Sequence, residues 1–146
     1  GWDYSRWYTT ADTYPQNAVR GPIVMVTNQW AGSDGDIVAA ATQAMGYAKV
    51  IGERSWGGVV GIDGRFDLVD GTSVTQPRYA GWYGSYGWGV ENHGVDPDIV
   101  VTVSPEDWEA DRDVQLDAAI AECLRQLDDK PAATAPELPG PAFGRR

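Results

Sequence analysis

Short apolar runs alternate with polar, glycine-rich segments along the first third of the chain, and this pattern predicts a mixed α/β fold. The run 23–27 is short and rich in β-branched residues, which is typical of a buried strand. Apolar residues then recur at helical spacing up to Met45, and Gly46 stands where a helix-ending glycine is expected. Residues 49–52 predict a second strand, so 22–52 is expected to form a parallel strand–helix–strand unit. The helix is expected to bury a face made up of Ile37, Ala40, Ala41, Ala44 and Met45.

The middle of the chain is rich in glycine and in short β-type runs. Residues 55–61 predict a loop or a bent strand. Residues 65–69 and 72–77 flank Asp70-Gly71, which is a strong signal for a β hairpin. Residues 80–89 alternate glycine with Trp and Tyr, and 99–103 predict a further strand. This region is therefore expected to form a glycine-rich hairpin region rather than helices.

Two helices are predicted near the C-terminus. The segment 104–107, Ser-Pro-Glu-Asp, has the residues that favour a helix start, and Asp111 or Asp113 is expected to cap the last helix. The apolar face of that helix is expected to contain Leu116, Ile120, Cys123, Leu124 and Leu127. Residues 129–146 are rich in Pro and Ala without any period, so we expect a disordered tail after a domain of residues 1–128.

Composition and charge exclude some classes of function. The net charge of −10 argues against a nucleic-acid partner, which requires a basic surface. No apolar run reaches the ~20 residues that a membrane span needs. The single cysteine, Cys123, cannot form an internal disulfide, so we expect a cytoplasmic protein. With one His and one Cys a metal site is not expected, and no cofactor is predicted.

The strongest candidate for a catalytic residue is Ser33. It lies in the turn Ala31-Gly32-Ser33-Asp34-Gly35, between the first predicted strand and the helix that follows it. Such a turn exposes a hydroxyl at the edge of a sheet, beside the free N–H groups of a helix N-terminus. The N–H of Asp34 is the natural donor to an oxyanion. A simpler interpretation is that Ser33 only caps the helix, because serine is a preferred N-cap residue and Ala31 replaces the first glycine of Gly-x-Ser-x-Gly.

A serine nucleophile needs a base, and His93 is the only histidine of the chain. Ser33, His93 and one carboxylate from Glu91, Asp96 or Asp98 would make a triad. A serine and a histidine occur together by chance in many chains of 146 residues. The distance between Ser33 and His93 along the sequence is therefore weak evidence for a triad. The triad is therefore kept as an alternative.

Several separated segments resemble the tricorn core proteases, which are relatives of the C-terminal processing peptidases. They are Gly-Pro-Ile-Val-Met-Val-Thr-Asn-Gln-Trp-Ala-Gly-Ser-Asp-Gly-Asp-Ile (21–37), Gly-Glu-Arg-Ser-Trp-Gly-Gly-Val-Val-Gly-Ile (52–62), Leu-Val-Asp-Gly-Thr-Ser-Val-Thr-Gln-Pro (68–77) and Gly-Trp-Gly-Val-Glu-Asn-His-Gly-Val-Asp-Pro-Asp (87–98). Several motifs in one order are more specific than any single motif. The resemblance covers about residues 1–128 and favours the catalytic interpretation of Ser33 over the cap.

The resemblance implies a crotonase/Clp-protease-like α/β core and a Ser–His–Ser–Glu tetrad. Within this chain it implies Ser33 as the nucleophile, Glu91 as the tetrad glutamate and Asp34 as an oxyanion-hole donor. The histidine and the second serine would lie upstream, so the chain is expected to be a fragment that is inactive alone. Under this interpretation His93 takes no part in catalysis.

The resemblance also implies partners and specificity. We expect peptide substrates with a basic residue before the scissile bond, recognised by an acid for which Asp3 is the candidate, and assembly into hexamers. Trp56, Gly57, Gly58 and the aromatic segment 82–88 are expected to line the substrate groove or a subunit contact. No nucleic-acid or membrane partner is expected. The alternatives are a non-catalytic peptide-binding relative of the same fold and a crotonase-type enzyme acting on acyl-thioesters.

Overall fold

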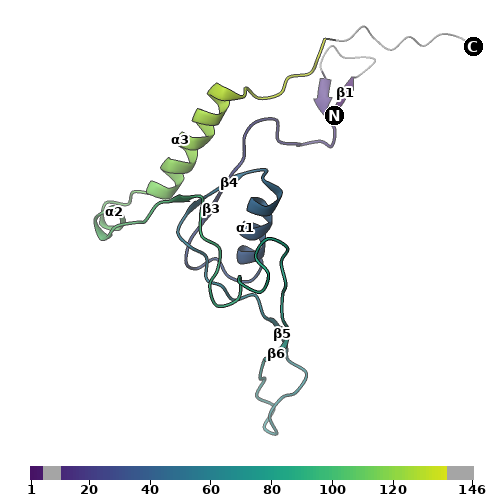
Figure 1. Ribbon diagram of the computed structural model, residues 1–146, viewed down its shortest axis with the longest axis vertical. Coiled ribbons are helices and arrows are strands. Elements are labelled where there is room, and N and C mark those ends of the chain that lie inside the picture. Colours follow the sequence, from purple (N-terminus) through teal and green to yellow (C-terminus); the bar gives the residue numbers. More distant parts are fainter. Residues whose placement is uncertain (5–10, 138–146) are drawn as a thin grey trace, which may run out of the picture.

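The structure is a computed structural model that describes residues 1–4 and 11–137 (Figure 1). It confirms the predicted mixed α/β composition. Its elements, in chain order, are β1 (Trp2–Tyr4), β2 (Ala11–Thr13), β3 (Val24–Thr27), α1 (Asp34–Met45), β4 (Lys49–Gly52), β5 (Gly61–Asp63), β6 (Gln76–Tyr79), β7 (Ile99–Val100), α2 (Pro105–Glu109) and α3 (Val114–Asp129).

A three-stranded parallel sheet in the order β3-β4-β7 organises the fold. Strand β3 pairs with β4 from Val24 opposite Lys49 to Thr27 opposite Gly52, and α1 connects the two strands. The predicted parallel strand–helix–strand unit is therefore confirmed. Both long helices pack on β3 and β4, and Figure 1 shows α1 on one side of these strands and α3 on the other.

Helix α1 begins and ends with unusual backbone conformations. It ends at Gly46, whose left-handed φ of 63° confirms the predicted glycine cap. It begins after Ser33, which has φ 55° and ψ −114° and makes no side-chain capping hydrogen bond. A positive φ at a residue other than glycine costs about 1–3 kcal/mol and persists only where the surroundings impose it. Here Ser33 is held by its own N–H, which donates to the Gly58 carbonyl at 3.1 Å.

The buried face of α1 differs from the expected one. Ala40 is buried as predicted, but Met45 is 67% exposed and Ala44 is exposed. The residues that α1 buries are Asp36, Ala39, Ala40 and Thr42. The reason is that part of the core is formed by Val59, Val90 and Val95, which belong to loops whose position the local spacing of α1 cannot indicate. A carboxylate therefore lies on the core-facing side of this helix.

The core is small and lies where α1, β4 and two loops meet. Val50, Val90 and Val95 are fully buried in one cluster with Ala39, Ala40 and Val59, and Met25, Ile37, Tyr83 and Tyr86 pack against it. Val90 and Val95 bracket the segment 91–94, so the core fixes both ends of the loop that carries Glu91. Packing of this kind restricts where the loop can lie.

The glycine-rich middle forms an arm that extends away from the core (Figure 1). Strands β5 and β6 pair antiparallel, from Gly61 opposite Tyr79 to Asp63 opposite Gln76. A turn does form at Asp70-Gly71, where the Leu68 N–H donates to the Thr72 carbonyl at 2.9 Å. The segments beside it are not strands, so the predicted strand positions 65–69 and 72–77 are wrong except at the β6 residues 76–77. The ladder stops at Asp63, and beyond it no other element of the described chain provides a surface on which those segments could pack.

Both C-terminal helices begin as predicted. Ser104 and Asp107 form a reciprocal capping box at α2, and Asp113, rather than Asp111, caps α3 by accepting from the Leu116 N–H at 2.9 Å. The expected apolar face of α3 is partly wrong. Its buried residues are Gln115 and Ala119, whereas Leu116, Ile120 and Leu124 are exposed. Gln115 lies inward because its side-chain amide donates to the Val101 carbonyl at 2.9 Å.

After α3 the described residues 131–137 contain neither helix nor strand. Their N–H and carbonyl groups are partly bonded to the N-terminal part of the chain, for example from the Ala133 N–H to the Arg20 carbonyl at 2.9 Å. The rest of the predicted tail, 138–146, lies outside the described residues, and its disorder stays a prediction. Within the described ranges, none of the helices combines the length and the apolar character that crossing a bilayer requires.

The end of β4 provides a test of the sheet packing. Gly52 has φ 124°, and a Cβ there would lie 2.0 Å from the Thr27 carbonyl oxygen. We expect Gly52→Ala to lower the free energy of unfolding by well over ~1 kcal/mol, because it adds a backbone clash to the strain of a positive φ. Gly71→Ala is the matched control, because Gly71 also has a positive φ of 82° but has no atom near its added Cβ. Equal shifts in melting temperature for the two variants would contradict this account.

The start of α1 provides a second test. Because the Ser33 hydroxyl caps nothing, we expect Ser33→Ala to change the free energy of unfolding by less than ~0.5 kcal/mol. We expect Ser33→Gly to raise the melting temperature or leave it unchanged, since glycine adopts a positive φ without strain. Ser104→Ala is the comparison, because Ser104 does accept from the Asp107 N–H and its loss should cost about 1 kcal/mol. A loss at Ser33 as large as that at Ser104 would show that Ser33 is a structural cap.

Candidate active site

Ser33 lies in a sharp turn between β3 and α1, and its side chain is exposed. Two backbone hydrogen bonds hold this turn against the segment 56–58. The Trp56 N–H donates to the Ala31 carbonyl at 2.9 Å, and the Ser33 N–H donates to the Gly58 carbonyl at 3.1 Å. With no cap to make, the hydroxyl is free for other chemistry. A strained, exposed serine at a strand-to-helix turn is the arrangement of a nucleophile elbow.

The N–H of Asp34 is a free donor beside this hydroxyl. It is the first N–H of α1, and it donates to no acceptor among residues 1–4 and 11–137. The first N–H groups of a helix lack intrahelical partners and lie at the positive end of the helix dipole. A negative oxygen that develops near Ser33 would therefore find both a hydrogen-bond donor and a favourable potential.

Glu91 lies on the loop between Val90 and Val95. Its carboxylate is held by residues 59–60, which directly follow the Gly58 carbonyl that binds the Ser33 N–H. Its Oε2 accepts hydrogen bonds from the Val59 N–H at 2.7 Å and from the Val60 N–H at 2.8 Å. Its other oxygen, Oε1, has no partner within the part of the chain that the structure describes. Two backbone donors fix the direction of the carboxylate and leave one oxygen available to a further group.

A small pocket adjoins Glu91. Its volume is about 290 Å³, and Trp88 forms part of its wall with the indole largely exposed. The residues that line it are Val60, Ala80, Gly81, Trp88, Glu91 and Asn92. The lining is mostly apolar, so a polar group that enters it would have the Glu91 carboxylate as its acceptor.

A buried carboxylate that the sequence analysis missed, that of Asp36, connects the start of α1 beside Ser33 with the segment 55–58. Asp36, in the first turn of α1, is 0% exposed and accepts hydrogen bonds from the Ser55 hydroxyl, from the Gly57 N–H at 2.8 Å and from the Gly58 N–H at 3.1 Å. Ser55 Oγ in turn accepts from the Val95 N–H at 2.8 Å. Buried polar groups are paired in folded proteins, and here every donor comes from another segment.

The sequence contains a signal for Asp36, although it points to the wrong partner. Ser33-x-x-Asp36 has the spacing of a capping box, in which the acid would accept from the N-cap N–H. In the structure the Ser33 N–H bonds to Gly58 instead, and Asp36 bonds to residues 55, 57 and 58. The acid is therefore used for a long-range contact rather than for the local one.

Gly57 and Gly58 have their backbone groups occupied within the chain. Their N–H groups bond to Asp36, the Gly58 carbonyl accepts from Ser33, and the Gly57 carbonyl accepts from the Asn92 N–H at 2.7 Å. Gly57 has φ 86°, and a Cβ there would lie 2.4 Å from the Gly94 nitrogen. These glycines are required by close packing, and their predicted contact with substrate stays a prediction.

Trp56 lies over the glycines beside Ser33. A Cβ on Gly32 or on Gly58 would come within 2.4 Å of its indole ring, so the ring rests on bare backbone at both positions. The side chain is nevertheless 68% exposed on its outer surface. In the aromatic segment 82–88 the residues divide: Tyr83 and Tyr86 pack against the core, while Trp82 and Trp88 are exposed.

His93 lies near Glu91 in sequence but points to other partners. Its Nε2 is 2.9 Å from Asp96 Oδ2, and Arg54 Nε bonds to the other oxygen of Asp96 at 2.7 Å. The hydrogen bonds from His93 and Arg54 hold the pKa of Asp96 below its usual range. Asp98 accepts from the Val50 N–H at 2.8 Å. Among the described residues no hydrogen bond joins His93 to Ser33, so the structure does not assemble the alternative triad.

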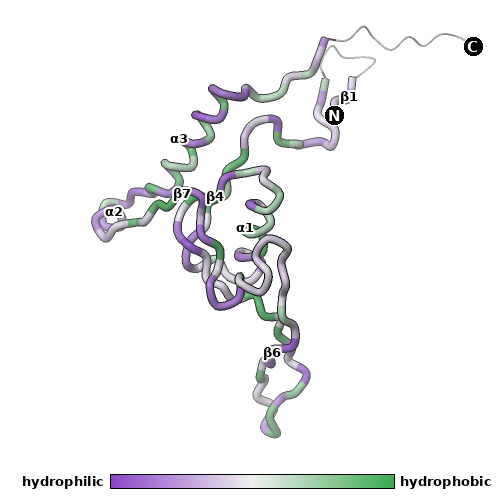
Figure 2. The backbone as a smooth tube through the Cα atoms, in the orientation of Figure 1, coloured by the Kyte–Doolittle hydropathy of each residue, from purple (hydrophilic) through white to green (hydrophobic). Residues whose placement is uncertain are grey.

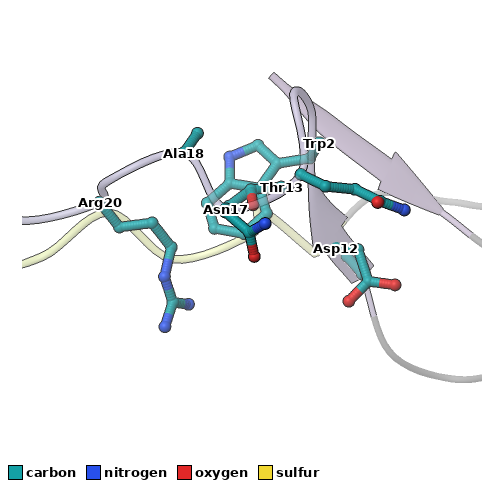
Figure 3. Close-up of a pocket in the computed structure, with 8 residues that line it drawn as sticks. Trp2, Asp12, Thr13, Asn17, Ala18 and Arg20 are labelled. Carbon is teal, nitrogen blue, oxygen red and sulfur yellow. The ribbon is translucent and has the colours of Figure 1, made fainter.

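Asp3 lies in β1, exposed, directly opposite Asp12 of β2. Asp12 also lines a pocket of about 650 Å³ in which Arg20 lies over the Trp2 ring, 5.9 Å from its centroid. Figure 3 shows the Asp12 carboxylate and the Arg20 guanidinium on separate sides of this pocket. Neither Ser33 nor Glu91 lines it. The structure therefore does not bring Asp3 together with the other candidate residues within this chain.

Comparison with known proteins identifies relatives of this arrangement. The profile of peptidase family S41 matches residues 3–101. The chain is 58% identical over 139 residues to tricorn protease homolog 1 of Streptomyces coelicolor, covering 95% of this chain and 13% of the relative. It is 48% identical over 118 residues to the tricorn protease of Thermoplasma acidophilum, covering 81% of this chain and 11% of the relative.

The structural comparison agrees with the sequence comparison. The crystal structure of the tricorn protease matches with a TM-score of 0.82 at 46% identity, over 88% of this chain and 12% of that protein. The chain thus spans only 11–13% of the length of these relatives. The predicted resemblance is confirmed, and the chain belongs to peptidase family S41, with strong similarity to tricorn proteases.

Proposed function

We propose that this chain supplies the nucleophile Ser33 and the supporting carboxylate Glu91 of a serine-type endopeptidase. One observation carries the proposal: Ser33 is held at φ 55° in an exposed turn without a capping bond, directly before the free N–H of a helix. A strained serine whose hydroxyl makes no capping hydrogen bond is otherwise a cost to the fold. Membership of a peptidase family supports the same assignment.

In the proposed reaction the Ser33 hydroxyl attacks the carbonyl carbon of a peptide bond. The carbonyl oxygen becomes negative in the tetrahedral intermediate, and the Asp34 N–H donates a hydrogen bond to it. Removing one such donor typically costs about 3–4 kcal/mol of transition-state stabilisation. The Ser33 proton passes to the base, which gives it to the leaving amine as the C–N bond breaks. Water, deprotonated by the same base, then attacks the acyl-serine, the new carboxyl end of the peptide leaves, and Ser33 regains its proton.

The base for this reaction lies outside the chain in our proposal. His93 is bonded to Asp96, so we propose that a histidine and a second serine from an upstream part of the protein complete a tetrad. The free Oε1 of Glu91, at the edge of the pocket with Trp88, supports a role in accepting from that serine. The isolated chain is then expected to be inactive.

We further propose a preference for a basic residue before the scissile bond, with Asp3 as the acid that binds it. Asp3 and Asp12 lie directly opposite each other, and like charges in this register repel. A substrate cation would relieve the repulsion. Because β1 does not adjoin Ser33 within one chain, this role requires the site to include a β1 from elsewhere in an assembly.

We also propose assembly into hexamers, a cytoplasmic location and a crotonase/Clp-type core. Phe66, Leu68 and Val69 are exposed on the β5–β6 arm, and Figure 2 shows apolar residues along it, which supports contact with other copies in a hexamer. The single half-buried Cys123 supports a reducing, cytoplasmic location. The parallel β3–α1–β4 unit supports a crotonase/Clp-type core.

The assignment of Ser33 is tested by covalent labelling of the full gene product that contains this chain. We expect a fluorophosphonate to modify Ser33, because its hydroxyl is exposed and activated, and we expect no labelling of Ser33→Ala. Mass spectrometry of the digested protein identifies the modified residue. His93→Gln is the control and should label as the unaltered protein does. Labelling lost in His93→Gln would restore the Ser33–His93 triad, and no labelling at all would favour a non-catalytic peptide-binding relative.

The role of Glu91 is tested by kinetics on the same protein. We expect Glu91→Gln to lower kcat about 10²-fold, because the residue that orients the base loses its anionic acceptor. The amide keeps the size of the side chain, so the melting temperature should fall only slightly. Peptide hydrolysis with a fluorogenic substrate measures kcat and KM separately. A kcat equal to that of the unaltered protein would remove Glu91 from the site.

A further inference from the structure

Asp36 is a buried carboxylate that the proposed reaction does not use. It is 0% exposed, and within the described chain no Lys or Arg pairs with it. Its negative charge is met by the Ser55 hydroxyl, two backbone N–H groups and the positive end of the α1 dipole. Burying a charge is costly unless hydrogen bonds compensate it, so the donors must stay in place.

These donors belong to a segment that also holds Glu91. The four consecutive N–H groups of residues 57–60 are divided between two carboxylates: the first two donate to Asp36 and the last two donate to Glu91. Asp36 lies three residues after Ser33, in the first turn of α1. The segment 57–60 therefore connects the Ser33 turn to the Glu91 carboxylate and fixes the distance between them.

A second connection runs from Asp36 to the Glu91 loop through Ser55. The Ser55 hydroxyl donates to Asp36 and accepts from the Val95 N–H, and the Ser55 N–H donates to the Val95 carbonyl at 3.1 Å. Gly94 makes this contact close, since a Cβ there would lie 2.1 Å from the Ser55 carbonyl oxygen. Both ends of the Glu91 loop are thus fixed relative to the first turn of α1.

We propose that Asp36 is a positioning residue that, together with Ser55, sets the place of Glu91 relative to Ser33. The proposal rests on the function proposed above for these two residues. It assigns Asp36 no contact with substrate. Its effect on catalysis passes through the position of Glu91 relative to Ser33, because the groups that bind Asp36 among the described residues belong to Ser55 and the segment 57–60, which connect the Ser33 turn with the Glu91 loop.

The test uses Asp36→Asn in the full gene product. One oxygen of Asp36 accepts from Ser55 and Gly57 and the other from Gly58, so an amide nitrogen in either place faces a donor. We expect the segment 57–60 to shift and kcat to fall by about 10- to 100-fold, while KM changes far less, since misplacement of a catalytic group by ~1 Å has effects of this size. Ser55→Ala is expected to lower kcat in the same way, and it is the second variant should Asp36→Asn fold poorly.

Thr42→Val is the matched control. Thr42 is also buried on α1, and its hydroxyl lies 2.9 Å from the Tyr47 hydroxyl, away from residues 55–60. The control should lower the melting temperature but keep kcat. A fall in kcat for Thr42→Val that matches its loss of stability would show that kcat follows stability alone, and this would overturn the proposal.

A double variant separates positioning from general destabilisation. If Asp36 acts through Glu91, Asp36→Asn combined with Glu91→Gln should have the kcat of Glu91→Gln alone, within about twofold. Losses that multiply, an unchanged kcat in Asp36→Asn, or failure of both Asp36→Asn and Ser55→Ala to fold would overturn the proposal. Failure of the underlying function is distinct from these results, because it would appear as full activity in Glu91→Gln or as no labelling of Ser33.

Discussion

The candidate site depends on the burial of one carboxylate, that of Asp36. A charged group removed from water has to be met by donors, and the available donors are the Ser55 hydroxyl and the N–H groups of Gly57 and Gly58. Meeting this requirement holds the segment 55–60 against the start of α1. The valines of the core exclude water from the same region, but apolar contacts have no direction and cannot decide which N–H faces which carboxylate. The hydrogen bonds make that choice.

The same contacts maintain the strained turn. Ser33 keeps its positive φ because its N–H is bonded to the Gly58 carbonyl and its carbonyl accepts from the Ile37 N–H at 3.0 Å. Gly58 can approach so closely only without a side chain, since the Trp56 ring already occupies the space where its Cβ would be. The strained φ of Ser33 and the need for glycine at position 58 therefore both follow from the close contact between the Ser33 turn and residues 56–58. That arrangement leaves the hydroxyl exposed and the next N–H free.

Features that depend on neighbouring residues were predictable from the sequence. The strand at Val24–Thr27, the cap at Gly46 and the capping box at Ser104 all follow from residues close together in the chain, and the structure has each of them. Features that depend on distant partners were predicted less well. The turn at Asp70-Gly71 is present, but the strands that pair lie farther from it than expected. On α3, periodicity could not indicate that Gln115 would be drawn inward by the Val101 carbonyl while Leu116 stayed exposed.

The sequence by itself determined the strand–turn–helix that presents Ser33 and the ordered motifs that identify the peptidase family. Only the tertiary structure decided the partners of Asp36, for which the local spacing indicates the Ser33 N–H, and the pairing of Asp96 with Arg54, 42 residues away. The physical reason is the separation of the partners along the chain. Asp36 and Gly57 are 21 residues apart, Val59 and Glu91 are 32, and Ser55 and Val95 are 40. A hydrogen bond over such separations depends on how the whole core closes, which no local pattern of residues contains.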